Sequence, residues 1–132
     1  MEEKKIASTQ LRPEGNRTTK APLVSIDIYE AIQNIRQETS WETGDRNAIT
    51  LYKSDQIRVV LVALHQGAEL TRHTADCTIS VQVLEGKIMF NTDEKSEEMN
   101  VGQMVVLQKD IPHEVKAIAE SVFLLTLVPD SE

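Results

Sequence analysis

A chain of 132 residues, 40% of them hydrophobic and 27% charged, is long enough for one globular domain and too short for two. Its 21 acidic and 14 basic side chains give a net charge of -7, which argues against partners with a phosphate backbone or an anionic lipid surface. One cysteine excludes a disulfide within the chain, and no stretch approaches the roughly 18 apolar residues of a membrane span, so we expect a cytoplasmic protein.

Residues 1–22 are poor in apolar side chains. After Met1 they hold only Ile6 and Leu11 as large apolar side chains. Such a segment cannot bury enough surface to offset the entropy of ordering its backbone, about 1 to 2 kcal/mol per residue. We expect a flexible N-terminal arm over residues 1–22, followed by a single domain over residues 23–132.

The next segment has the period of an amphipathic helix. Apolar residues recur at positions i, i+3, i+4 and i+7 from Ile28 to Ile35, which places them on one face. Asp27 stands where a helix cap is expected, and Glu30 follows three residues later, as in a capping box. The pattern predicts one short helix that covers the core of the domain.

After Trp41 the apolar residues recur with period 2. Turn residues such as the pair Glu85 and Gly86 separate the runs, and residues 57–64 are apolar on both faces, as expected for a strand between two layers. Residues 91–100 carry five charges and are expected as a solvated hairpin end. The predicted strands cover residues 49–52, 57–64, 68–72, 78–84, 87–90, 104–107, 114–118 and 122–128.

This succession of short strands predicts a mainly β protein. We expect an antiparallel β-barrel or jelly roll, also described as a double-stranded β-helix, over about residues 48–128, preceded by one short N-terminal helix.

Two stretches of the chain resemble the two signatures of the cupin superfamily. The first is GAELTRHTADCTISVQVLEG over residues 67–86, and the second is GQMVVLQKDIPHEV over residues 102–115. The gap between Gly86 and Gly102 is short, as in compact single-domain cupins. The resemblance implies a small barrel of the kind predicted above from the strand pattern.

The resemblance also implies a metal site, which this sequence matches only in part. In the family, two histidines and a glutamate of the first signature and a histidine of the second hold an ion inside the barrel. Here His73 and His113 match the first and last of these ligands, whereas Ala75 and Ile79 stand at the other two positions. Two imidazoles alone predict a degenerate site that binds Fe, Mn, Ni or Zn weakly, unless Asp76 or Cys77 joins them.

Three functions remain open at this point. The leading hypothesis is a barrel that binds, or modestly transforms, a small organic ligand. The second is a metal-dependent cupin enzyme, an oxygenase, isomerase or epimerase, that uses His73 and His113. The third is a structural or regulatory dimer without a ligand. The expected pocket residues are His73, His113, Ile79, Val81, Val83, Met89, Met104, Val106 and Phe123.

We also expect a homodimer. The run over residues 57–64 is apolar on both faces, so something outside one sheet must cover it. Single-domain chains that resemble cupins commonly pair, which favours a second copy as the cover.

Overall fold

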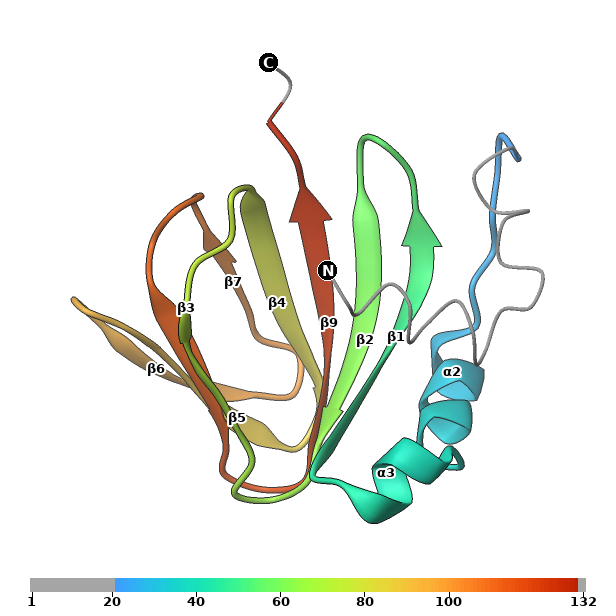
Figure 1. The fold of residues 1–132 in the computed structure, drawn as a ribbon, viewed down its shortest axis with the longest axis horizontal. Helices are drawn as coiled ribbons and strands as arrows, with labels where there is room; N and C mark the ends of the chain where they lie inside the picture. The colour runs from blue at the N-terminus through green and yellow to red at the C-terminus, as the bar shows by residue number, and fades with distance from the viewer. Residues whose placement is uncertain (1–20, 131–132) are drawn as a thin grey trace.

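The computed structural model describes residues 21–130, which fold into two antiparallel sheets that face each other, with two helices beside one of them (Figure 1). This confirms a mainly β jelly roll preceded by a short helix. The predicted arm, residues 1–22, lies outside the described residues except for its last two positions. In chain order the elements are α2 (Ile28–Ile35), α3 (Thr39–Thr43), β1 (Arg46–Lys53), β2 (Arg58–Leu64), β3 (Glu69–His73), β4 (Thr78–Glu85), β5 (Lys87–Thr92), β6 (Ser96–Asn100), β7 (Met104–Leu107), β8 (His113–Ala117) and β9 (Ser121–Val128).

The strand order shows how the jelly roll closes. One sheet has five strands in the order β1-β2-β9-β4-β7, and the other has four in the order β3-β8-β5-β6. All the pairings are antiparallel, and neighbours such as β2 and β9 are distant in sequence. This arrangement brings the end of β3 against the start of β8, where both signature histidines lie.

The interior of the barrel is filled by alternate residues of both sheets. On β4, Ile79, Val81 and Val83 are buried, while the residues between them are only partly covered. Phe123 on β9 and Phe90 on β5 meet them in the same cluster. The period of 2 in the sequence therefore corresponds to one face of each strand packed inside the barrel.

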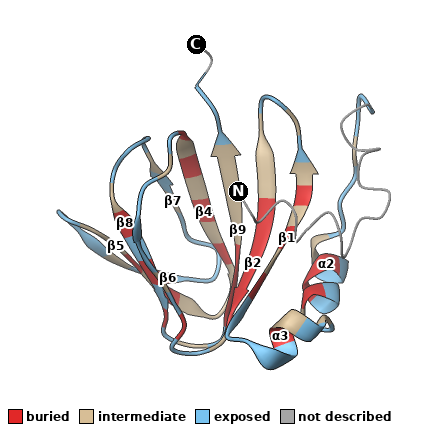
Figure 2. Cartoon of the chain, viewed as in Figure 1, coloured by how far each residue is buried: buried red, intermediate tan, exposed pale blue. Residues whose placement is uncertain are grey.

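A second core lies on the outside of the five-stranded sheet. The apolar face of α2, with Ile32 and Ile35, packs with Trp41 of α3 against outward residues of β1, β2 and β9 such as Leu61. Figure 2 shows this buried layer between the helices and the strands. The apolar run of β2 is therefore covered within the chain, so it no longer requires a second copy.

The helix prediction is confirmed in its start, and two further elements differ from expectation. The Asp27 carboxylate accepts the backbone N–H of Glu30 at 3.1 Å, as predicted for the cap of α2. The short helix α3 was not predicted, and the expected loop at residues 91–100 contains β6. Among the described residues, no helix is long and apolar enough to cross a membrane.

Candidate functional site

The two signature histidines meet at one end of the barrel. His73 ends β3 and His113 begins β8, and they are partners in the antiparallel pairing of the two strands. Their ring centroids lie 4.3 Å apart with the planes tilted by 58°. The loops that carry them are also tied together, because the N–H of Asp110 donates to the carbonyl oxygen of Ala75 at 2.8 Å. We call this end of the barrel the open end.

Backbone carbonyls fix the tautomer of both rings. Nδ1 of His73 lies 2.6 Å from the carbonyl oxygen of Thr71, and Nδ1 of His113 lies 2.9 Å from that of Ile111. A carbonyl oxygen can only accept, so each Nδ1 carries the proton. In the neutral rings both Nε2 atoms are left with a lone pair, ready to accept a hydrogen bond or to bind a cation.

The two rings differ in their surroundings. His73 is exposed, whereas His113 is only 4% exposed and stacks on Phe90 with the centroids 5.5 Å apart. Burial lowers the pKa of His113, and the neighbouring His73 lowers it further, while the bond to the Ile111 carbonyl raises it. His113 is therefore held neutral at physiological pH, with Nε2 as an acceptor.

A pocket of about 590 Å³ lies beside the histidine pair, between the tip of the β5–β6 hairpin and β7 with the loop after it. Phe90 contributes to its wall and also stacks on His113, which connects the pocket to the pair. At its charged rim, Arg72 pairs with Asp93 and lowers the pKa of that carboxyl. The pocket is lined by Phe90, Thr92, Asp93, Glu94, Lys95, Glu97, Val105, Val106, Leu107, Ile111 and Pro112.

The structure resembles many solved proteins of one superfamily. A cupin superfamily protein from Desulfitobacterium hafniense superposes with a TM-score of 0.62 at 13% identity, over 64% of this chain and 78% of that one. An RmlC-like cupin from Shewanella frigidimarina superposes with a TM-score of 0.62 at 19% identity, over 67% and 80%. This chain has the cupin fold. A conserved protein of unknown function from Streptococcus pyogenes is also similar, with a TM-score of 0.67 at 22% identity, over 87% and 94%.

These likenesses establish the small cupin domain and leave its activity open. No family model matches the sequence, and no curated protein matches it. The residues at the open end of this cupin domain are therefore the observations that bear on its function.

The metal-binding set of the family does not fit this cupin domain. Ala75 and Ile79, at two of the four ligand positions, pack with the barrel core. Within residues 21–130, no group of three or more His, Cys, Asp or Glu side chains is placed to hold a metal ion, so Asp76 and Cys77 do not complete the pair. Cys77 is buried, and its burial raises the pKa of the thiol, which keeps it protonated.

Four of the predicted apolar pocket residues face the barrel interior. Ile79, Val81, Val83 and Phe123 all belong to the buried cluster inside the barrel, and they pack the core rather than line the pocket described above.

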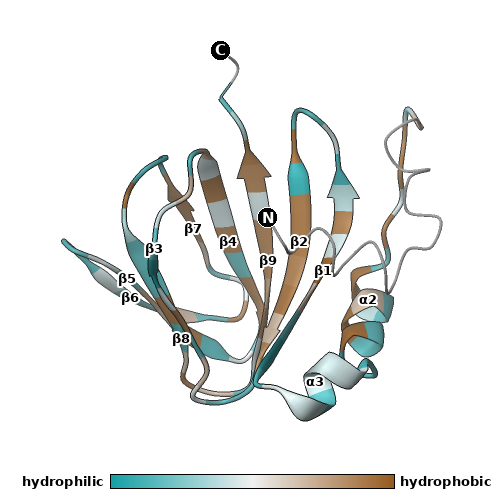
Figure 3. Ribbon diagram, viewed as in Figure 1, coloured by the Kyte–Doolittle hydropathy of each residue, from teal (hydrophilic) through white to brown (hydrophobic). Residues whose placement is uncertain are grey.

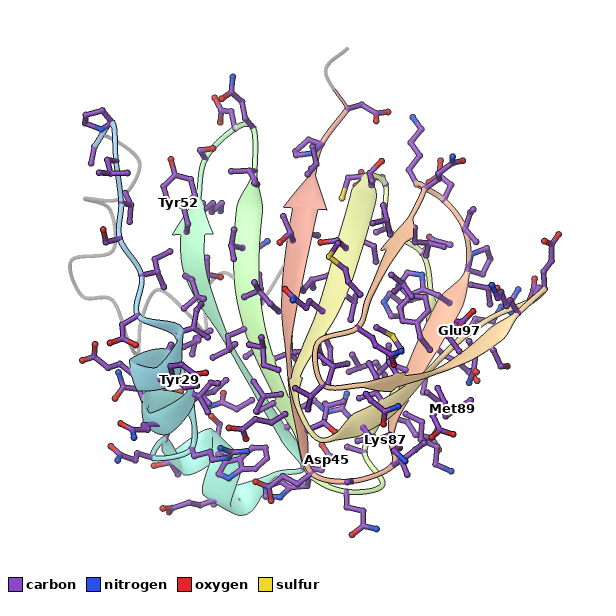
Figure 4. All side chains as sticks on the ribbon, turned by 180° about the vertical axis from the view of Figure 1, so that it is seen from behind. Tyr29, Asp45, Tyr52, Lys87, Met89 and Glu97 are labelled. Carbon is purple, nitrogen blue, oxygen red and sulfur yellow. The ribbon has the colours of Figure 1, made fainter. Side chains whose placement is uncertain are left out.

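Three others face away from the barrel interior, and one of them, Val106, nevertheless lines the pocket. Met104 and Val106 are 56% and 64% exposed on the outside of β7, and Val105 and Leu107 face inward in their place. Met89 lies between the buried Ile88 and Phe90 and so on the opposite side of β5 (Figure 4). Both strands are apolar on consecutive residues, so the sequence does not indicate which residues of these strands turn inward.

Apart from Val106, none of the residues that line the pocket was predicted to do so, among them Phe90 and the loop residues Ile111 and Pro112. The IPH sequence of the second signature was a signal for the latter two, because it places both directly before His113. His65 lies elsewhere: its ring stacks on Trp41 with the centroids 3.5 Å apart, and its Nε2 donates to the Trp41 carbonyl oxygen at 2.9 Å.

Proposed function

We propose that the open end of this cupin domain binds a small organic molecule beside His73 and His113, and that it does so without a resident metal ion. One observation carries the proposal: two imidazoles, 4.3 Å apart between centroids, each use Nδ1 on a backbone carbonyl, and Nε2 of each has no hydrogen-bond partner within residues 21–130. A pocket of about 590 Å³ beside them is large enough for a compact ligand.

The chemistry of the walls indicates what such a ligand offers. Phe90, Val105 and Leu107 supply apolar surface for a hydrocarbon or aromatic body. The Nε2 acceptors favour a hydroxyl or N–H donor at the end of that body. A neutral Nε2 also accepts a proton from a bound acid, so a modest acid–base reaction at His113 is included in the proposal.

Metal content tests this proposal against the metal-dependent enzyme. We expect freshly purified protein to contain well under one equivalent of Fe, Mn, Ni and Zn together, because two imidazoles leave most of the coordination sphere to water. After exhaustive chelation the melting temperature should not change, since the described core is apolar and closed without an ion. If chelation removes a full equivalent and the melting temperature collapses, the metal-dependent oxygenase, isomerase or epimerase replaces the proposal.

A variant separates ligand binding from a purely structural function. His113→Ala should fold with a cooperative transition and lose the stabilisation that small organic probes give the wild type. The alternative of a structural or regulatory dimer predicts that no probe stabilises either protein. The matched variant His65→Ala removes a histidine that stacks on Trp41 and has no ring contact with the pair, so it should keep the probe response.

We also propose that the protein is a cytoplasmic homodimer. The cytoplasmic location rests on the sequence, with its single cysteine and its net charge of -7. The dimer rests on apolar side chains that the chain leaves exposed, Leu23, Tyr29, Val101, Met104 and Val106 among them.

A further inference from the structure

The outer face of the five-stranded sheet is covered over only part of its width. Helices α2 and α3 bury the outward residues of β1, β2 and β9, such as Leu61 and Val122. At the other edge, Met104 and Val106 of β7 remain 56% and 64% exposed. Strand β7 is thus exposed in Figure 2 and hydrophobic in Figure 3, a combination that marks a contact surface.

The strand register shows that the covered and uncovered parts belong to one continuous surface. Leu61 pairs with Leu124, Leu124 with Gln82, and Gln82 with Met104. The two ends of this row of residues differ in burial. Leu61 and its neighbour Leu124 pack under the helices, whereas nothing within residues 21–130 covers Met104.

The neighbouring row repeats the pattern. Val59 pairs with Thr126, Thr126 with Ser80, and Ser80 with Val106. We call Ser80, Gln82, Met104 and Val106 the β4–β7 face.

Charge indicates what covers this face. Its four residues carry no charge, in a chain whose net charge is -7 and in which 27% of residues are charged. Two copies of such an acidic chain repel each other. The free energy lost to desolvation is smallest where their contact buries no carboxylate. An uncharged apolar face is therefore complementary to itself, as a twofold contact requires.

We infer that a second copy of this chain covers the β4–β7 face. The inference rests on the homodimer proposed above and assigns its surface. Each copy would contribute β4 and β7, and Met104 and Val106 would be buried against the equivalent residues of the partner copy. Val106 also lines the pocket, so the contact would border the pocket, whereas Met104 lies outside it.

A second exposed apolar set competes for this assignment. Leu23 and Tyr29 are 82% and 80% exposed, and Tyr29 is on the outer side of α2 (Figure 4). Asp27 and Glu30 lie next to them in sequence and are also exposed. A twofold contact there would bring like charges together, which favours the β4–β7 face.

Self-association of the full chain tests the inference through Met104→Lys. Met104 lies on the face but does not line the pocket, so the variant leaves the proposed ligand site intact. The matched control is Tyr29→Lys, which adds the same charge at the competing set. By light scattering and sedimentation equilibrium we expect wild type and Tyr29→Lys near 30 kDa, twice the chain mass of 14.8 kDa. Met104→Lys should associate at least about 30-fold more weakly, as for loss of a central contact.

Each remaining outcome overturns a defined part of the account. If Tyr29→Lys becomes a monomer, whether or not Met104→Lys does, the interface includes α2 and the inference is wrong. If both variants stay dimeric, the interface lies elsewhere and it is also wrong. If wild type is a monomer of about 15 kDa at all concentrations, the homodimer itself fails, whereas probe binding at His113 is unaffected. Unchanged melting temperatures of both variants, relative to a wild type diluted below its dissociation constant, exclude unfolding as the cause.

Discussion

The two ends of the barrel differ in how completely their polar groups are used. At the end opposite the histidines, the Glu85–Gly86 hairpin packs against the turn that leads into β9. Ser121 is fully buried there, accepts the N–H of Lys87 at 3.0 Å, and lies 2.7 Å from the Ala119 carbonyl oxygen. We call this the closed end. The polar groups named here hydrogen-bond to one another and so stabilise the fold.

At the open end some polar atoms have no hydrogen-bond partner within the described residues. His73 and His113 bind their own loops through Nδ1 and leave Nε2 free, and a pocket lies beside them. Asp110, in the loop before His113, has a positive φ of 64°, a strained conformation for a residue with a side chain. The closed end therefore contributes to the stability of the fold, whereas the open end carries the ligand site proposed above.

The largest loss of stability should come from adding a methyl group to a glycine at the closed end. Gly86 has a φ of +85°, and a Cβ there would clash with the carbonyl oxygen of Glu120 and with Ser121, whose Cα would lie 2.7 Å away. We expect Gly86→Ala to destabilise the fold by more than about 4 kcal/mol, because backbone on both sides must move. Urea denaturation of the purified variant, or its failure to accumulate as folded protein, measures this.

A matched glycine separates crowding from backbone conformation. Gly102 has a similar φ of +91° but no atom within 4 Å of its added Cβ. Gly102→Ala should therefore cost only about 1 to 2 kcal/mol, the strain of a left-handed alanine. Equal losses for the two variants would refute the claim that the closed end is close-packed.

The next effect should come from the buried hydroxyl of Ser121. Ser121→Ala removes a fully buried hydroxyl and leaves the N–H of Lys87 without this acceptor, which should cost about 1 to 3 kcal/mol. As a control, Ser80→Ala changes a hydroxyl on the outer face of β4. Its free energy of unfolding should stay within about 0.5 kcal/mol of wild type. Denaturation midpoints of the two variants that coincide would contradict this role of Ser121.

At the open end, His113 should make stability depend on pH. Its folded pKa lies below the ordinary histidine value of about 6.5 because burial disfavours the charged ring. Above that value both states are neutral. Below it the unfolded chain takes up the proton first, so the free energy of unfolding falls as the pH decreases, by up to about 1.4 kcal/mol per pH unit.

The variant that isolates this dependence is His113→Gln, which removes the ring and keeps a polar side chain. The difference between its stability and that of wild type should shrink as the pH is lowered from 8 to 5. A difference that is constant over this range would show that His113 titrates alike in both states.

The smallest effect should come from the surface ion pairs of Arg36. Its guanidinium lies 2.7 Å from Glu85 and 3.1 Å from Glu120, and all three side chains are partly exposed. Arg36→Gln should cost about 0.2 to 1 kcal/mol, and the loss should decrease in high salt. A loss above about 2 kcal/mol that ignores salt would place Arg36 among the packing residues of the closed end.

The sequence predicted the regular elements well where one face is clearly apolar. The alternation on β4 identified Ile79, Val81 and Val83 as interior residues, and Asp27 identified the start of α2. It failed on β7 and β5, where consecutive apolar residues leave the phase of the alternation open. Strand β6 carries charges and is defined by its pairing with β5 rather than by its own pattern.

The candidate site was predictable in its histidines and not in its surroundings. The spacing of the two cupin signatures singled out His73 and His113, and the β3–β8 pairing brings them together. The pocket comes from residues far apart in sequence, such as Phe90 and Pro112, whose proximity depends on the tertiary fold. No periodicity in a single strand encodes that proximity.

The most direct test of the central claim is a long-range ¹H–¹⁵N spectrum of the imidazole nitrogens. The chain has only three histidines, and His65 donates through Nε2, so it serves as an internal control of the opposite tautomer. In metal-free protein at about pH 8, where imidazoles are ordinarily neutral, we expect His73 and His113 as Nδ1–H tautomers. Their Nε2 signals should move on addition of a small phenol or alcohol from a probe panel, while those of His65 stay fixed. Protonated Nε2 atoms on both rings, or a panel that moves no signal of His113, would contradict the account.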